Sequence, residues 1–180
     1  MRSLDDAVAH RPPSLAFTAR LLQLSASFCF LAGWMPASHA CLSEAGSRYG
    51  ISPHLLWSIA RVESGLRPDA INGAHRRRTG TYDIGLMQIN SSHLDRLKRF
   101  GIGETDLFDA CTNLMVGAWI LADLFARHGR TWEAVGAYNA SCRSMTKHAC
   151  QDARTRYAWK VFRHLPPDRA APTPTTGAPS

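Results

Sequence analysis

The sequence lacks the patterns that would identify a metal-binding, repeat or membrane protein. None of its eight histidines forms an H-x-x-x-H pair, the helical zinc pattern. Its five cysteines include no C-x-x-C pair, the other common zinc pattern. No internal repeat is visible, and no apolar run approaches the roughly 20 residues that span a membrane. We therefore expect no metal and no cofactor.

Acidic residues are in the minority, since 14 Asp and Glu stand against 21 Lys and Arg. A basic surface favours anionic partners such as nucleic acid, lipid headgroups or cell-wall polymers. The only dense basic run, H-R-R-R-T-G (75–80), is interpreted as a solvated loop. Because the other basic residues are spread out, we do not expect nucleic-acid binding. With 180 residues, 45% of them apolar, the chain suits one globular domain.

Residues 1–40 have the layout of a secretory signal peptide. Arg20 precedes a mostly apolar run of about a dozen residues, and S-H-A (38–40) is a small-residue exit. The part before Arg20 is long and contains Asp5 and Asp6, so a retained anchor or a misassigned start is the alternative. We predict cleavage after Ala40 and export to the periplasm.

Four cysteines remain after this cleavage, an even number that indicates two disulfides in an exported protein. Three pairings of Cys41, Cys111, Cys142 and Cys150 are possible. Cys142 and Cys150 flank a short polar loop and are the natural local pair. Cys41 and Cys111 would then tie the mature N-terminus to a central helix, a long closure that stabilises by about 3–4 kcal/mol in the chain-entropy model.

The remaining domain is predicted to be mainly α-helical. Residues 164–180 are rich in Pro, Thr and Ala, so we place the domain at 41–165 and a disordered tail at 166–180. The stretch 71–90 contains two turn signals, N-G and T-G, and forms a small irregular or β lobe. Periodicity and capping residues predict helices over 42–50, 52–64, 109–129, 131–141 and 150–165.

One carboxylate stands out on the apolar face of a predicted helix. Leu56, Ala60 and Glu63 lie at i, i+4 and i+7, which places Glu63 inside or at the edge of a cleft, near the last helical turn. The negative helix C-terminus and an apolar wall both raise the pKa of a carboxyl, as a general acid requires. From these residues alone, a buried structural acid or a solvent-facing glutamate is equally compatible.

Two further blocks follow E-S-G (63–65): G-L-M-Q-I-N (85–90) and A-Y-N-A-S (137–141). Together they resemble the signature of the lytic transglycosylases of the goose-type lysozyme-like superfamily, in the same order and at similar spacing. The resemblance extends from Cys41 to about Val161. The cysteine placement and the short length are most similar to the small transglycosylases that accompany secretion, conjugation and pilus machines.

The resemblance implies a lysozyme-like fold whose cleft binds peptidoglycan glycan strands. It implies cleavage of the β-1,4 bond between N-acetylmuramic acid and N-acetylglucosamine, with Glu63 as the single catalytic acid and a 1,6-anhydro product. Tyr138 matches a residue that lies over the acid and orients it, and Ser64 matches one that binds near the reacting sugars. The positions that match substrate-binding residues are Ser64, Met87, Gln88, Tyr138 and Asn139. Residue by residue, the alternatives are core packing for Met87, a bond to its own loop for Gln88 and an ordinary interface role for Tyr138.

Two other functions stay open at this point. A two-carboxylate hydrolase needs a second acid about 5–9.5 Å from the first. The nearest candidates in the sequence are Asp69 and Asp83, and we expect Asp83 to brace the loop before Gly85. If Asp83 were catalytic, the protein would be a hydrolytic muramidase. The other alternative is a non-catalytic wall-binding component of an export machine. We expect a monomer, with components of a secretion, conjugation or pilus apparatus as further partners.

Overall fold

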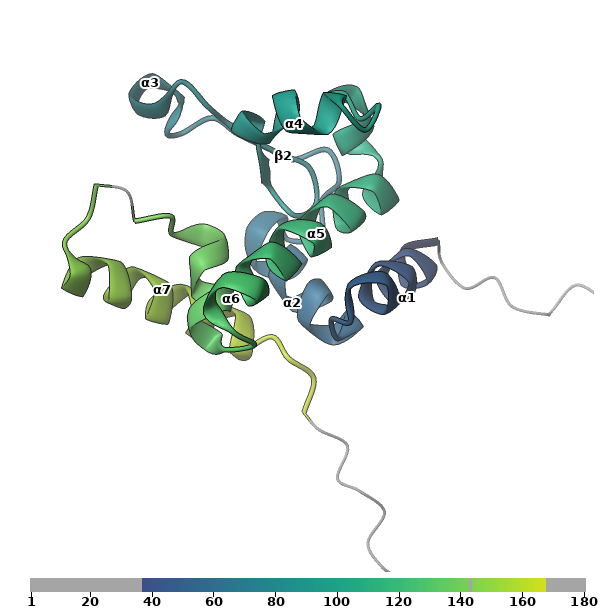
Figure 1. Cartoon of the computed structure of the whole chain (residues 1–180). Coiled ribbons are helices and arrows are strands. Elements are labelled where there is room, and N and C mark those ends of the chain that lie inside the picture. The colour runs from purple at the N-terminus through teal and green to yellow at the C-terminus, as the bar shows by residue number, and fades with distance from the viewer. Residues whose placement is uncertain (1–36, 143, 168–180) are drawn as a thin grey trace, which may run out of the picture. The chain divides into compact units, whose positions relative to one another are not determined.

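The computed structural model describes residues 37–142 and 144–167, and within them it is mainly helical with a small β lobe, as the sequence predicts (Figure 1). The predicted signal peptide and tail lie outside the described residues except for 37–40 and 166–167. Along the chain the elements are α1 (Ala37–Tyr49), α2 (Pro53–Ser64), β1 (Ile71–Asn72), α3 (Arg76–Thr79), β2 (Asp83–Ile84), β3 (Ile89–Asn90), η1 (Ser91–His93), α4 (Leu94–Lys98), η2 (Thr105–Phe108), α5 (Ala110–His128), α6 (Trp132–Asn139) and α7 (Lys147–Phe162).

The helix ends follow local capping chemistry. Helix α2 has Pro in its first turn and stops at Gly65 in the left-handed conformation, as the sequence predicts. Asp109 and Thr131 cap α5 and α6 by accepting backbone N–H bonds. Two starts differ from the prediction. Helix α1 begins at Ala37, so the predicted cleavage point lies inside it, and α7 begins at Lys147 because Thr146 caps it.

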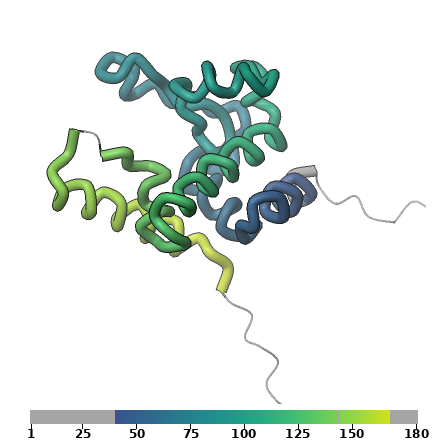
Figure 2. The backbone as a smooth tube through the Cα atoms, in the orientation of Figure 1, coloured from purple at the N-terminus to yellow at the C-terminus, as the bar shows by residue number. Residues whose placement is uncertain are grey.

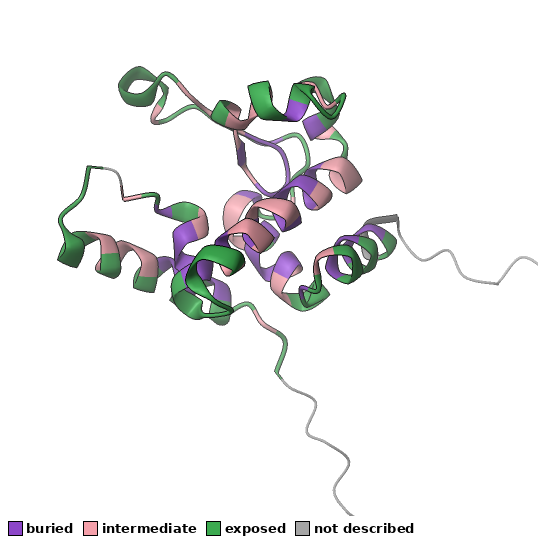
Figure 3. Cartoon of the chain, viewed as in Figure 1, coloured by how far each residue is buried: buried purple, intermediate pink, exposed green. Residues whose placement is uncertain are grey.

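Helix α5 is the central element of the domain. It packs against α1, α2 and α6, and α7 packs against both α2 and α6. Figure 2 shows α5 crossing the middle of the domain and ending beside α6, and Figure 3 shows buried segments in α5 and in the helices around it. Fully buried side chains of α2, α5 and α7 form much of the core, among them Leu56, Ile59, Leu114, Leu121 and Val161.

The lobe between α2 and α4 is a three-stranded antiparallel sheet in the order β1-β2-β3. Ile71 pairs with Ile84, and Asp83 pairs with Asn90. The basic run predicted as a loop contains the short helix α3, whose residues are exposed, and the Arg76 guanidinium lies 4.7 Å from the Tyr82 ring centre. The described residues contain no group of three or more His, Cys, Asp or Glu side chains that could hold a metal ion. None of the helices in this part of the chain is long and apolar enough to cross a membrane.

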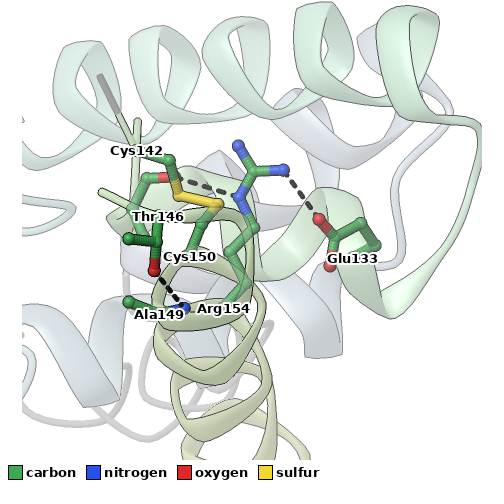
Figure 4. Close-up of a disulfide and its surroundings, with 7 residues drawn as sticks. Glu133, Cys142, Thr146, Ala149, Cys150 and Arg154 are labelled. Carbon is green, nitrogen blue, oxygen red and sulfur yellow. Dashed lines mark hydrogen bonds and ion pairs between the residues drawn. A yellow bond between two sulfur atoms is a disulfide. The ribbon is translucent and has the colours of Figure 1, made fainter. Parts of the chain in front are cut away.

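Two disulfides tie the helices together, and they have the pairing that the sequence favoured. Cys41 in α1 bonds Cys111 in the first turn of α5, and Cys142 bonds Cys150. Figure 4 shows Arg154 beside the second disulfide, with its Nε donating to the Ala140 carbonyl at 3.1 Å and Nη1 donating to Glu133 at 2.7 Å. The loop between α6 and α7 is thus held covalently and by this arginine.

Removal of each disulfide tests its contribution to stability. The bond between Cys41 and Cys111 closes 70 residues and the one between Cys142 and Cys150 closes 8. Chain entropy then predicts losses of about 4 kcal/mol and about 2.5 kcal/mol for the paired Cys→Ala variants. Urea unfolding of the two double variants against the parent measures both losses. A smaller loss for the Cys41–Cys111 pair than for the other pair would contradict the expected order.

Candidate active site

Glu63 lies in the last turn of α2, on the same face of the helix as the buried residues Leu56 and Ala60, as its spacing predicts. Its side chain is partly buried. The Tyr157 hydroxyl, from α7, donates a 2.5 Å hydrogen bond to Glu63 Oε1. The carboxyl is therefore held between two helices that are far apart in the sequence.

The pKa of Glu63 is raised from its ordinary value of 4.5 to about 7, and burial is the largest cause. The nearby negative charge of Asp83 raises the pKa further, whereas the hydrogen bond from Tyr157 and the positive charge of Lys160 lower it. Burial also raises the pKa of Tyr157 well above its usual range, so this phenol remains a neutral donor. A large fraction of Glu63 is thus protonated near neutral pH and can donate a proton.

Ser64 joins the end of α2 to the loop at 85–88. Its buried hydroxyl donates to the Leu86 carbonyl at 2.7 Å and accepts the Arg67 N–H at 3.0 Å. Because the single hydroxyl proton and one acceptor position are both used, the structure gives Ser64 a bracing role, and the substrate contact implied by the resemblance stays a prediction.

The loop at 85–88 is a tight turn with unusual backbone geometry. Gly85 and Gln88 have φ angles of +76° and +50°. Met87 is fully buried, and its side chain packs against Gly117 of α5, where an added Cβ would lie 2.7 Å from Met87 Cε. The structure therefore places the Met87 side chain in the core, the alternative left open by the sequence, and it presents no surface to a substrate.

Gln88 and Tyr138 also bind this loop. Gln88 Nε2 donates to the carbonyls of Ala70 at 3.2 Å and Gly85 at 2.9 Å, so backbone carbonyls use both amide protons. The Tyr138 hydroxyl donates to the Met87 carbonyl at 3.1 Å. Tyr138 was expected to lie over the acid and orient it, and the hydrogen bond to Glu63 Oε1 comes from Tyr157. Burial raises the pKa of Tyr138 well above its usual range, and the nearby Glu63 charge raises it further.

Asn139 and the two candidate second acids lie in different surroundings. Asn139 and Asp69 are exposed. Asp83 is partly buried, accepts a 2.7 Å hydrogen bond from Asn90 Nδ2 and lies 3.7 Å from His75 Nε2. The bond to Asn90 joins β2 to β3 and agrees with the bracing role that we predicted for Asp83.

Two important residues were missed by sequence reasoning. Asn113 is fully buried, and its amide accepts the Met87 N–H and donates to the carbonyls of Ile84 and Leu107, at 2.7 to 3.0 Å. Tyr157 is the other. The sequence contains a signal for both, because each polar side chain lies on the buried face of its helix. A buried Asn or Tyr needs hydrogen-bond partners for its polar atoms, which indicates a structural or functional contact.

Comparison with known proteins shows the family to which the chain is related. The family described as Transglycosylase SLT domain matches residues 40–161. The invasion protein IagB of Salmonella typhimurium is 45% identical over 123 residues, which cover 68% of this chain and 72% of IagB. IpgF of Shigella flexneri is 38% identical over 124 residues, which cover 68% of this chain and 77% of IpgF. A putative peptidoglycan-binding-like protein of Escherichia coli K12 is 40% identical, with 78% of this chain and 90% of that protein covered.

Among solved structures, the lytic transglycosylase Slt of Pseudomonas aeruginosa matches with a TM-score of 0.55 and 22% identity. The match covers 72% of this chain and 24% of that chain. It confirms the predicted lysozyme-like fold.

The raised pKa of Glu63 predicts a specific change in stability with pH. A carboxyl whose pKa is raised by folding binds its proton more tightly in the folded state, so it stabilises below its unfolded pKa and loses this contribution as pH rises toward 7. The full difference is on the order of 3 kcal/mol. Glu63→Gln keeps the shape and the bond from Tyr157, so it should match the parent at about pH 4 and exceed its stability at about pH 8.

Thermal unfolding across this pH range measures the effect. Glu44→Gln, at an exposed glutamate of α1, is the matched control and should leave the pH dependence unchanged. Equal destabilisation of Glu63→Gln at every pH would instead identify Glu63 as a structural acid.

Proposed function

The chain belongs to the transglycosylase SLT domain family and is a peptidoglycan lytic transglycosylase, and we propose that Glu63 is its catalytic acid and that its product ends in 1,6-anhydro-N-acetylmuramic acid. One observation carries the proposal: a partly buried carboxyl at a helix end, with a pKa of about 7 and a tyrosine donor on one oxygen. General acid catalysis is most effective with a pKa near the working pH.

The bond from Tyr157 assigns different roles to the two carboxyl oxygens. Since the Tyr157 hydroxyl donates to Oε1, the acidic proton resides on Oε2. Glu63 Oε2 donates this proton to the glycosidic oxygen as the bond to muramyl C1 breaks, and N-acetylglucosamine leaves with a free C4 hydroxyl. The resulting carboxylate accepts the proton of the muramyl C6 hydroxyl while that oxygen closes onto C1. The proton returns to Glu63, and no water is consumed.

This reaction needs no second carboxylate, because the substrate's own hydroxyl is the nucleophile. Asp83 supports it indirectly, through a negative charge that raises the pKa of Glu63. The hydrogen bond from Asn90 occupies one carboxylate oxygen of Asp83 and holds this side chain against the neighbouring strand β3. A hydrolytic muramidase, in which Asp83 would activate water, is the second candidate because Asp83 is the acid that acts on Glu63.

The substrate contacts that we propose follow from which polar atoms are still available. Both amide protons of Gln88 are used by the carbonyls of Ala70 and Gly85, so its Oε1 is the group that would accept a bond from a sugar hydroxyl or N-acetyl N–H. Asn139 is exposed beside Tyr138 and would supply a further amide. Ser64, Met87 and Tyr138 support this surface by holding the loop at 85–88.

We place the mature enzyme, residues 41–165, in the periplasm, where it would open the wall locally for a secretion, conjugation or pilus machine. The similarity to an invasion protein and the small size of the domain support this placement. Deletion of the gene should impair assembly of one such machine. Normal secretion, conjugation and piliation in the deletion strain would contradict this role.

Mass spectrometry of muropeptides released from purified peptidoglycan tests the reaction. The parent should release anhydro-muramyl products, and Glu63→Gln should release none because an amide cannot donate the proton. Asp83→Asn, whose side-chain oxygen can still accept the bond from Asn90, should release the same anhydro products within about tenfold of the parent rate. Reducing-end products from the parent, lost in Asp83→Asn, would identify a hydrolase.

Tyr157→Phe tests the assigned role of the phenol. Loss of this hydrogen bond raises the pKa of Glu63, so the fall in activity on the alkaline side should move to higher pH, and turnover should drop by about 10-fold. The pH–rate profile of kcat measures both effects. Tyr138→Phe, whose hydroxyl binds the Met87 carbonyl, is the control and should leave the position of this limb unchanged. If the alkaline limb shifted in Tyr138→Phe and not in Tyr157→Phe, Tyr138 would be the tyrosine that acts on Glu63.

A further inference from the structure

A basic pocket lies where α2 and α7 end side by side. It has a volume of about 490 Å³ and is lined by Arg61, Val62, Lys160, Arg163 and His164. Arg61 and Val62 come from the last turn of α2, and the other three from the end of α7 and the residues that follow it. No acidic side chain lines it.

The charge of this pocket exceeds what the helix ends require. Basic residues near a helix C-terminus offset the negative end of its dipole, which is equivalent to about half an elementary charge per helix. Two helix ends therefore account for about one positive charge, whereas Arg61, Lys160 and Arg163 supply three. None of these three makes an ion pair with another residue in the described part of the chain. The pocket is thus suited to an anion from outside the chain.

Glu63 does not line the pocket, but one of the pocket's cations acts on it. Arg61 and Val62 directly precede Glu63. On α7, Lys160 follows Tyr157 by three positions, on the same face of the helix, and Tyr157 binds Glu63. The positive charge of Lys160 also acts on the Glu63 carboxyl. A molecule whose reacting bond lies at Glu63 can therefore place an anionic group in the pocket.

We propose that the pocket binds the carboxylates of the peptide stem carried by the substrate, an inference that rests on the proposed function. The stem is attached through the lactyl group of the muramic acid, the sugar whose C1 bond is broken. The hydroxyl and N-acetyl groups of the glycan carry no charge, so the stem is where the substrate offers carboxylates to Arg61, Lys160 and Arg163. The enzyme then discriminates in favour of glycan strands whose peptides carry free carboxylates.

Chemical amidation of purified peptidoglycan tests this, because carbodiimide and ammonia convert the stem carboxylates to neutral amides of nearly the same size. The parent should release anhydro-muramyl products from both substrates, with kcat/KM about 3- to 10-fold lower on the amidated one. The double variant Arg61→Gln/Arg163→Gln should lose most of this preference, because Lys160 is the only one of the three cations that remains in the pocket. Lys160 is left unchanged because it acts on Glu63.

Arg156→Gln is the matched control, since it removes the same charge from an exposed position of α7 that does not line the pocket. It should retain the parent's preference for the free carboxylates. Equal turnover of the two substrates by the parent, or loss of the preference in Arg156→Gln as fully as in the double variant, would overturn the inference while leaving the proposed reaction intact. No anhydro product from either substrate would overturn the proposed function itself, and the inference with it.

Discussion

The site depends on the buried amide of Asn113, which fixes the backbone of the loop that faces Glu63. One side chain binds three backbone groups from three segments, those of Ile84, Met87 and Leu107. A buried amide is costly unless its polar atoms are paired, so this arrangement is stable only as a complete set. Ser64 and Tyr138 then hold the neighbouring carbonyls of Leu86 and Met87, and the loop becomes a rigid surface beside the acid.

Opposing electrostatic effects give Glu63 a proton at the pH where it must act. Burial alone would favour the neutral acid strongly, and Asp83 acts in the same direction. The hydrogen bond from Tyr157 and the charge of Lys160 stabilise the carboxylate that forms after proton donation. Both charge states are therefore accessible, as a group that first donates and then accepts a proton requires. The residues that set the pKa of Glu63 come from α7 and from β2, so this pKa depends on the packing of both elements around α2.

The helices were predictable because their signals are local. The proline and glycine that bound α2 and the caps of α5 and α6 act within a few residues, and the burial of Glu63 follows from spacing along one helix. Roles that depend on distant contacts were not predictable. Tyr157 lies 94 positions from Glu63, and nothing near either residue indicates which tyrosine reaches the acid. Met87 and Ser64 were assigned to substrate through resemblance, whereas their contacts with Gly117 and Leu86 could be known only from the fold.

The disulfide between Cys41 and Cys111 has a consequence for where the enzyme can become competent. Cys111 stands in the first turn of α5, two positions before Asn113, so the covalent bond anchors the helical turn that presents this amide. Thiols stay reduced in a bacterial cytoplasm and oxidise after export. Under the export that we propose, the covalent tie beside the loop-holding residue forms only in the compartment that contains peptidoglycan. The same oxidation would then couple maturation of the site to arrival at the substrate.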